Sequence, residues 1–147
     1  MGVRVMATGV FDLLHPGHLY FLTEARKLGD ELVVVVARDQ TARRLKHEPY
    51  VPEHVRREMV EALKPVARAI LGSTTDIYET VVRERPQVIA LGFDQAWNDR
   101  EVESECARRG VRVRVVRIGP LPHNELATRR IVDRILERGP PPPEARS

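Results

Sequence analysis

The chain has 147 residues, enough for one domain with a substantial hydrophobic core. Its one cysteine, Cys106, cannot form an internal disulfide, and no apolar run is long enough for a membrane span or a secretory signal. The small net charge of +3 and the low aromatic content disfavour a nucleic-acid-binding protein. We therefore expect a soluble cytoplasmic domain with no nucleic-acid or membrane partner.

The N-terminal segment predicts a strand followed by a helix. Apolar residues alternate over residues 3–7, as in a strand, and recur at helical spacing after residue 18. Between these patterns, residues 9–18 read Gly-Val-Phe-Asp-Leu-Leu-His-Pro-Gly-His. Pro16 suits the first turn of a helix, because the N–H that proline lacks would have no partner there. His15 and His18 are therefore predicted at a helix N-terminus.

The rest of the chain alternates between strand and helix patterns. The continuous apolar run 31–37 is typical of a strand covered on both faces of a parallel sheet, and a long loop is expected after it. Further strands are predicted at 66–71, 88–91 and 111–118, and helices at 52–63, 76–85, 99–109 and 126–136. This alternation predicts an α/β fold, a doubly wound five-stranded parallel sheet with ligands at the C-terminal ends of its strands.

The last nine positions differ in composition from the rest. Residues 139–147 read Gly-Pro-Pro-Pro-Pro-Glu-Ala-Arg-Ser, which fits neither a helix nor a sheet. We expect a single domain over residues 1–138, followed by a disordered, proline-rich tail.

The two histidines indicate a phosphate-binding site. A helix N-terminus offers unpaired N–H groups and partial positive charge, and residues three apart lie on the same side of a helix. Two imidazoles there can donate hydrogen bonds to phosphate oxygens. A surface pair or a metal pair are the alternatives, but no third metal ligand is evident nearby and zinc pairs prefer an i, i+4 spacing. The missing Gly-x-Gly-x-x-Gly fingerprint disfavours a nicotinamide- or flavin-dependent oxidoreductase.

Residues 9–18 resemble the His-x-Gly-His signature of the nucleotidyltransferase superfamily, in its longer cytidylyltransferase-like form. The resemblance implies a Rossmann-like fold and attack of a substrate phosphate on the α-phosphorus of a nucleoside triphosphate, with expulsion of pyrophosphate. It implies catalytic roles for His15, His18 and Arg129, and no protein ligand to a metal. Nucleotide contacts are expected, besides the two histidines, from Gly9, Val10, Phe11, Pro16, Gly17, Lys46, Arg56, Gly92, Asp94 and Thr128.

The positions outside the first motif lie in segments that follow the predicted strands. Lys46 could reach the triphosphate or could be a solvated loop residue. Arg56 matches in position an arginine that related enzymes use on the phosphates. Residues 91–94 resemble the family's Leu-Gly-x-Asp, whose loop lies against base and ribose, although Asp94 could instead cap a turn. Thr128 and Arg129 resemble a Ser/Thr pair followed by a basic residue, with alanine in place of the first hydroxyl.

Over residues 3–135 the chain resembles the archaeal FAD synthases, which are FMN adenylyltransferases. The resemblance rests on residues 35–39, 52–66 and 71–73, whereas a cysteine pair that these enzymes tend to carry before the last helix is missing from residues 120–128. The resemblance implies that ATP and FMN are the substrates and that the reaction needs a divalent cation, expected to be Mg²⁺. Relatives of this kind are commonly dimers, so a homodimer is also expected. A CTP-dependent glycerol-3-phosphate cytidylyltransferase and a non-catalytic nucleotide-binding regulator are the alternatives.

Overall fold

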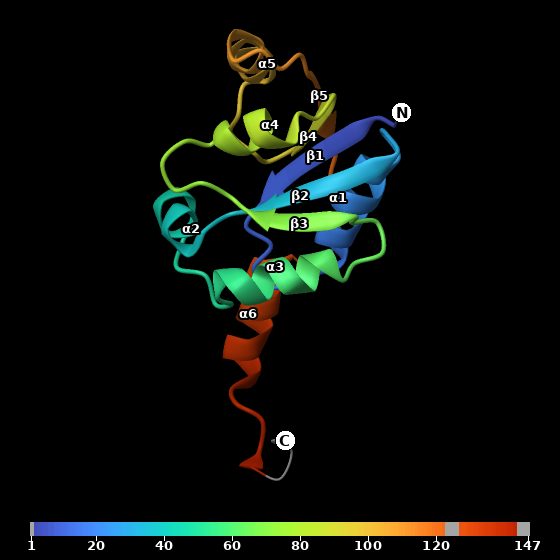
Figure 1. The fold of residues 1–147 in the computed structure, drawn as a ribbon. Helices are drawn as coiled ribbons and strands as arrows, with labels where there is room; N and C mark the ends of the chain where they lie inside the picture. Colours follow the sequence, from blue (N-terminus) through green and yellow to red (C-terminus); the bar gives the residue numbers. More distant parts are fainter. Residues whose placement is uncertain (1, 123–126, 144–147) are drawn as a thin grey trace.

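The computed structural model describes residues 2–122 and 127–143, in which strands and helices alternate (Figure 1). The elements are β1 (Arg4–Gly9), α1 (Pro16–Arg26), β2 (Glu31–Val36), α2 (Asp39–Leu45), α3 (Glu53–Glu61), β3 (Arg68–Leu71), α4 (Glu79–Glu84), β4 (Val88–Gly92), α5 (Asp99–Arg108), β5 (Arg114–Ile118) and α6 (Thr128–Arg138). None of the helices described is long and apolar enough to cross a membrane.

The sheet confirms the predicted fold class. Its five strands are parallel and lie in the order β3-β2-β1-β4-β5. The chain winds outward from β1 in one direction through β2 and β3, then returns to the other side of β1 for β4 and β5. Loops that leave the C-terminal ends of β1 and β4 therefore diverge, and such a reversal of strand order opens a crevice for ligands.

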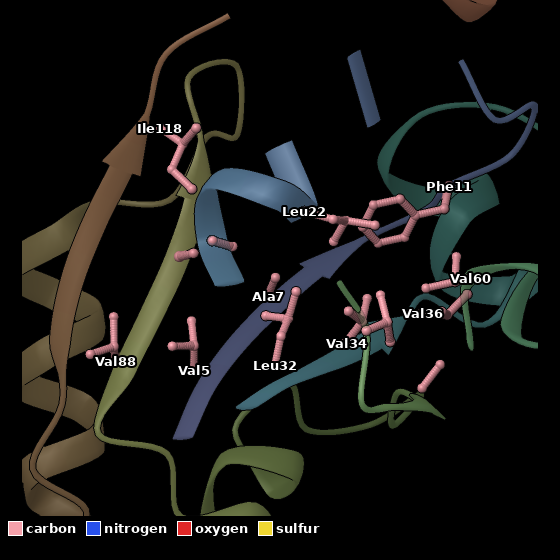
Figure 2. Close-up of a cluster of buried hydrophobic side chains, with 14 residues drawn as sticks. Val5, Ala7, Phe11, Leu22, Leu32, Val34, Val36, Val60, Val88 and Ile118 are labelled. Atoms are coloured by element: carbon pink, nitrogen blue, oxygen red, sulfur yellow. The ribbon is translucent and has the colours of Figure 1, made fainter. Parts of the chain in front are cut away.

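Two apolar layers cover the two faces of the sheet. Figure 2 shows the layer in which Val5 and Ala7 of β1 pack with Leu32 and Val34 of β2, beneath Leu22 of α1. The layer on the opposite face contains Met6 of β1 and Val35 of β2, together with residues of α4 and α5. Successive strand residues thus face opposite layers, which is why the run 31–37 is apolar throughout.

The main difference from the sequence-based prediction is helix α2. The segment after β2 was expected to be a long loop, yet residues Asp39–Leu45 are helical. Only Thr41 and Ala42 of this helix are buried, so its apolar face is too short to give a periodic pattern. The strands β3 and β5 also begin later than the patterns predicted, at Arg68 and Arg114.

The C-terminal helix extends away from the sheet, on the side of α1 and α3 (Figure 1). It ends at Arg138, and the following Gly139 has a φ of 70°, a conformation that favours glycine. The predicted start of this helix at residue 126 lies outside the described residues, as do residues 144–147 of the expected tail. The disordered tail therefore stays a prediction.

Candidate active site

A cavity of about 710 Å³ lies at the C-terminal ends of β1 and β4, where the strand order reverses. Its walls come from five segments: the loop between β1 and α1 with the first turns of α1, the segment after α2, the loop after β4, the end of β5 with the residues after it, and the first turns of α6. The sheet brings these segments together because the C-terminal ends of parallel strands meet at one edge. The cavity is therefore the candidate active site.

His15 caps the N-terminus of α1, as the sequence predicts. Its Nδ1 accepts a hydrogen bond from the backbone N–H of Gly17 at 3.0 Å. Because Nδ1 is an acceptor in this bond, a neutral His15 ring carries its proton on Nε2. The rings of His15 and His18 lie side by side, with centroids 3.8 Å apart. The structure thus brings two imidazoles together at a helix N-terminus that faces the cavity.

Burial keeps His18 uncharged. It lowers the pKa of His18 to about 3, and the positive charges of His15 and Lys46 contribute in the same direction. Burial also lowers the pKa of His15. Within the described part of the chain, Nδ1 of His18 is buried and has no hydrogen-bond partner. At neutral pH both rings are therefore neutral groups that can donate a hydrogen bond, and neither acts as a fixed cation.

Gly9 and Phe11 determine the shape of the histidine loop. Phe11 has a φ of 54°, which is uncommon for a residue with a side chain, and its ring is buried in the core beside Leu22 (Figure 2). A Cβ on residue 9 would lie 2.8 Å from this ring, so only glycine fits there. The Phe11 ring also meets His18 edge-on, with centroids 5.4 Å apart. Both predicted residues line the cavity, and they also position His18.

Arg56 is not brought to the cavity, in contrast to the prediction that it contacts the phosphates. Its side chain is 0% exposed, and its three guanidinium nitrogens donate to the carbonyl of Val51 at 2.8 Å, the carbonyl of Val10 at 2.7 Å and Oδ1 of Asp39 at 2.6 Å. A buried arginine with all its nitrogens engaged holds the protein together. Arg56 thus joins the histidine loop to α2 and to the segment before α3.

Asp12 makes the second connection between these loops, and the sequence analysis did not assign it a role. Its side chain is buried, and its two carboxylate oxygens accept from the backbone N–H groups of Tyr50 at 3.0 Å and Val51 at 2.9 Å. A carboxylate that accepts two backbone N–H bonds fixes the segment that donates them. The only signal in the sequence was the position of Asp12 inside the ten-residue motif.

The other predicted residues occupy several walls of the cavity. Lining residues that the sequence identified, besides those already placed, are Val10, Gly17, Lys46, Gly92, Asp94, Thr128 and Arg129. Pro16 is not among the lining residues and instead occupies the first turn of α1. Thr128 also has a structural contact, because its hydroxyl donates to the carbonyl of Leu13 at 3.0 Å. This bond ties the start of α6 to the histidine loop.

Gln95 and Arg117 fix the loop after β4. Sequence reasoning expected the segment from Gly92 to Gln95 to read the base, but it gave Gln95 no structural role and did not find Arg117. Oε1 of Gln95 accepts from the N–H of Gly92 at 2.7 Å, and its Nε2 donates to the carbonyl of Thr8 at 3.1 Å. Arg117 donates from Nη1 to the carbonyls of Gly92 and Gln95, both at 2.7 Å. Arg117 lies in β5, where polar and apolar residues are both expected along the strand. No sequence pattern therefore distinguished Arg117 from other polar strand residues.

The described part of the chain offers no protein cage for a metal ion. Among residues 2–122 and 127–143, no group of three or more His, Cys, Asp or Glu side chains could hold one. In proteins generally, Mg²⁺ keeps several waters and is commonly bound through substrate phosphates with few protein ligands.

Residues 6–135 match the family model described as cytidylyltransferase-like, and the chain belongs to this family of nucleotidyltransferases. The chain is 58% identical over 137 residues to the FAD synthase of Aciduliprofundum boonei, covering 92% of each protein. It is 53% identical over 135 residues to the FAD synthase of Methanothrix thermoacetophila, covering 91% of this chain and 94% of the relative.

A solved structure agrees with the fold. A crystal structure described as the lipopolysaccharide core biosynthesis protein of Thermoplasma volcanium has a TM-score of 0.81 and 48% identity, and the match covers 82% of this chain and 99% of that one. The high TM-score and the coverage of nearly all of that chain indicate that both chains share the same α/β fold.

Proposed function

We propose that this chain is an FMN adenylyltransferase, which transfers AMP from ATP to FMN and releases pyrophosphate. We choose ATP and FMN as the substrates because the chain is 46% to 58% identical to proteins named FAD synthase, over more than nine-tenths of its length. The paired histidines at the strand-order reversal support nucleotidyl transfer as the reaction.

The reaction needs no general base. The phosphate monoester of FMN has a second pKa near ~6, so the nucleophile is already an anion at neutral pH. One of its oxygens attacks the α-phosphorus of ATP, and a new P–O bond forms as the bond to the oxygen bridging to the β-phosphorus breaks. Pyrophosphate then leaves with the electron pair of that bond. Neutral His15 and His18 fit this chemistry, because they need only donate hydrogen bonds to phosphate oxygens.

The remaining polar groups of the cavity would align the two phosphates. Lys46 lies close enough to His18 to lower its pKa, and Arg129 enters the cavity from α6. Two cations from different segments of the cavity wall can bind the attacking phosphate and the leaving pyrophosphate. ATP would enter as its Mg²⁺ complex.

Activity measurements with paired substrates test the proposal. Purified protein with Mg²⁺ is incubated with ATP or CTP against FMN, glycerol 3-phosphate and phosphopantetheine, and pyrophosphate and coupled products are quantified. We expect ATP with FMN to give FAD and pyrophosphate. Turnover of CTP with glycerol 3-phosphate, without turnover of ATP and FMN, would establish the cytidylyltransferase alternative. Binding of a nucleotide without any pyrophosphate release would support the regulator.

We also propose that the protein forms a homodimer and is located in the cytoplasm. Ile135 and Leu136 of α6 are exposed, and large apolar side chains on a surface helix are compatible with a second copy. The mass of the protein in solution, measured by sedimentation, tests the dimer.

A further inference from the structure

Two exposed aromatic side chains stand at the cavity on opposite sides of the paired histidines. Tyr50 is 62% exposed and Phe93 is 60% exposed, and both line the cavity. Tyr50 belongs to the segment that follows β2 and α2, whereas Phe93 directly follows β4. Since β2 and β4 flank β1 on opposite sides, the two rings belong to opposite walls.

The backbone at Tyr50 is held in place while its ring stays exposed. The N–H of Tyr50 donates to Asp12, as does the N–H of Val51, and the carbonyl of Val51 accepts from buried Arg56. The ring of His47 lies 5.9 Å from that of Tyr50, centroid to centroid, and is tilted from it by 50°. The flat face of the Tyr50 ring, on a backbone that is held in place, is suited to stacking against a planar ligand.

The proposed product has two planar ring systems that such surfaces could hold. FAD carries an adenine and an isoalloxazine, joined through the two phosphates that meet at the reacting centre. With those phosphates at His15 and His18, an extended FAD would place one ring system toward each wall.

The two walls offer different groups to these rings. The loop at Phe93 presents Asp94 beside it, and a carboxylate of this kind can accept hydrogen bonds from the edge of a nucleotide base. The wall at Tyr50 presents the exposed face of the Tyr50 ring, with the ring of His47 beside it at an interplanar angle of 50°.

We propose that Tyr50 is the stacking platform for the isoalloxazine ring of FMN, and that it selects a flavin as the acceptor. The inference rests on the proposed function, because it assumes that FMN is the acceptor. It assigns to Tyr50 a contact with the ring of the acceptor, away from the reacting phosphates. Substitution of Tyr50 should therefore affect the affinity for FMN and leave the affinity for ATP unchanged.

Flavin fluorescence gives a readout that does not depend on turnover, since stacking against tyrosine quenches it. FMN at fixed concentration is titrated with wild-type protein and with the Tyr50→Ala, Tyr50→Phe and Phe93→Ala variants. We expect Tyr50→Ala to raise the Kd for FMN on the order of tenfold, as for the loss of one aromatic stacking partner, and to reduce the quenching. Tyr50→Phe should keep the affinity, because the stacking face remains.

Phe93→Ala is the matched control, because it removes an equally exposed aromatic side chain from the opposite wall. We expect it to weaken ATP binding and to leave the Kd for FMN unchanged. Melting temperatures should match the wild type in the Tyr50 variants, since Asp12 contacts only the backbone of Tyr50.

The outcomes separate the inference from the proposed function. If the wild type makes FAD but Tyr50→Ala binds FMN with unchanged affinity, or loses affinity for ATP instead, the inference is wrong and the proposed function stands. If the wild type neither binds FMN nor makes FAD, the proposed function fails and the inference fails with it.

Discussion

His18 is the residue whose environment departs most clearly from that of an ordinary surface histidine. It is held against Phe11 and His15 and its pKa is lowered to about 3. A neutral donor fixed before the substrate arrives stabilises a transition state without reorganising during the reaction. His18 would thus contribute a neutral hydrogen-bond donor, whereas many phosphate sites use positively charged side chains alone.

We expect His18→Ala to lower kcat by about 10²-fold or more, the usual loss for one preorganised donor. The melting temperature should change little, because the ring faces the open cavity and its buried Nδ1 has no partner among the described residues. Steady-state kinetics and thermal melting measure the two effects. His54→Ala is the control, because His54 is exposed on α3 and outside the cavity. A large loss of stability with near-normal turnover would make His18 a structural residue.

Removal of divalent cations should abolish activity. Lys46 and Arg129 are the cationic side chains that line the cavity in the described part of the chain, and the two histidines are neutral. These charges are too few to balance a triphosphate and an attacking phosphate together. Pyrophosphate release is measured with and without excess EDTA, and again after Mg²⁺ is restored. Full activity in EDTA would contradict the expectation.

At the scale of elements, the site depends on how its loops are joined. Asp12 and Arg56 connect the histidine loop with the segment that carries Lys46 and Tyr50. The bonds of Asp12 to Tyr50 and Val51, and that of Arg56 to Val10, link residues that are 38 to 46 positions apart in the chain. Because the side chains of Asp12 and Arg56 are both buried, their hydrogen bonds hold the two loops in a fixed position relative to each other.

Arg56→Ala should lower the free energy of unfolding by about 3 kcal/mol, because it removes a fully buried side chain and leaves two partly buried carbonyls and Asp39 without their partner. Urea unfolding measures the change. Arg57→Ala is the matched control: the neighbouring arginine is partly exposed and pairs with Glu61, so about 0–1 kcal/mol is expected. If Arg56→Ala kept full stability and only weakened nucleotide binding, Arg56 would be a phosphate-binding residue, as the resemblance to related enzymes implies.

At the scale of the whole molecule, the buried histidines couple folding to pH. In the unfolded chain His18 takes up a proton near its ordinary pKa of 6.5, whereas in the folded protein it stays neutral down to about 3. The unfolded state therefore binds more protons between these two values, and stability falls as the pH falls below 6.5. The lowered pKa of His15 acts in the same direction.

We expect wild-type protein to lose stability between about pH 6.5 and pH 5, by at most about 1.4 kcal/mol per pH unit from His18. Urea unfolding at several pH values, for wild type and for His18→Gln, isolates this contribution. The variant should show the shallower pH dependence, because glutamine does not titrate. Equal slopes for the two proteins would show that His18 does not stay neutral in the folded state.

The sequence by itself determined the alternation of strands and helices, the parallel sheet and the position of the paired histidines. Each of these follows from local information. The continuous apolar run of β2 reflects burial on two faces, and Pro16 marks where α1 begins. The ten-residue motif is contiguous, so it could be recognised without knowing the fold.

Only the tertiary structure decided what Arg56, Asp12, Gln95 and Arg117 do. Their partners lie in other loops, and which loops meet depends on the strand order β3-β2-β1-β4-β5. A buried structural arginine and a phosphate-binding arginine can occupy the same position in a sequence motif. The spacing of residues therefore could not show which of these roles Arg56 has. The distinction arises because burial of a charged group demands a full set of partners, and those partners are specified by the packing of the whole chain.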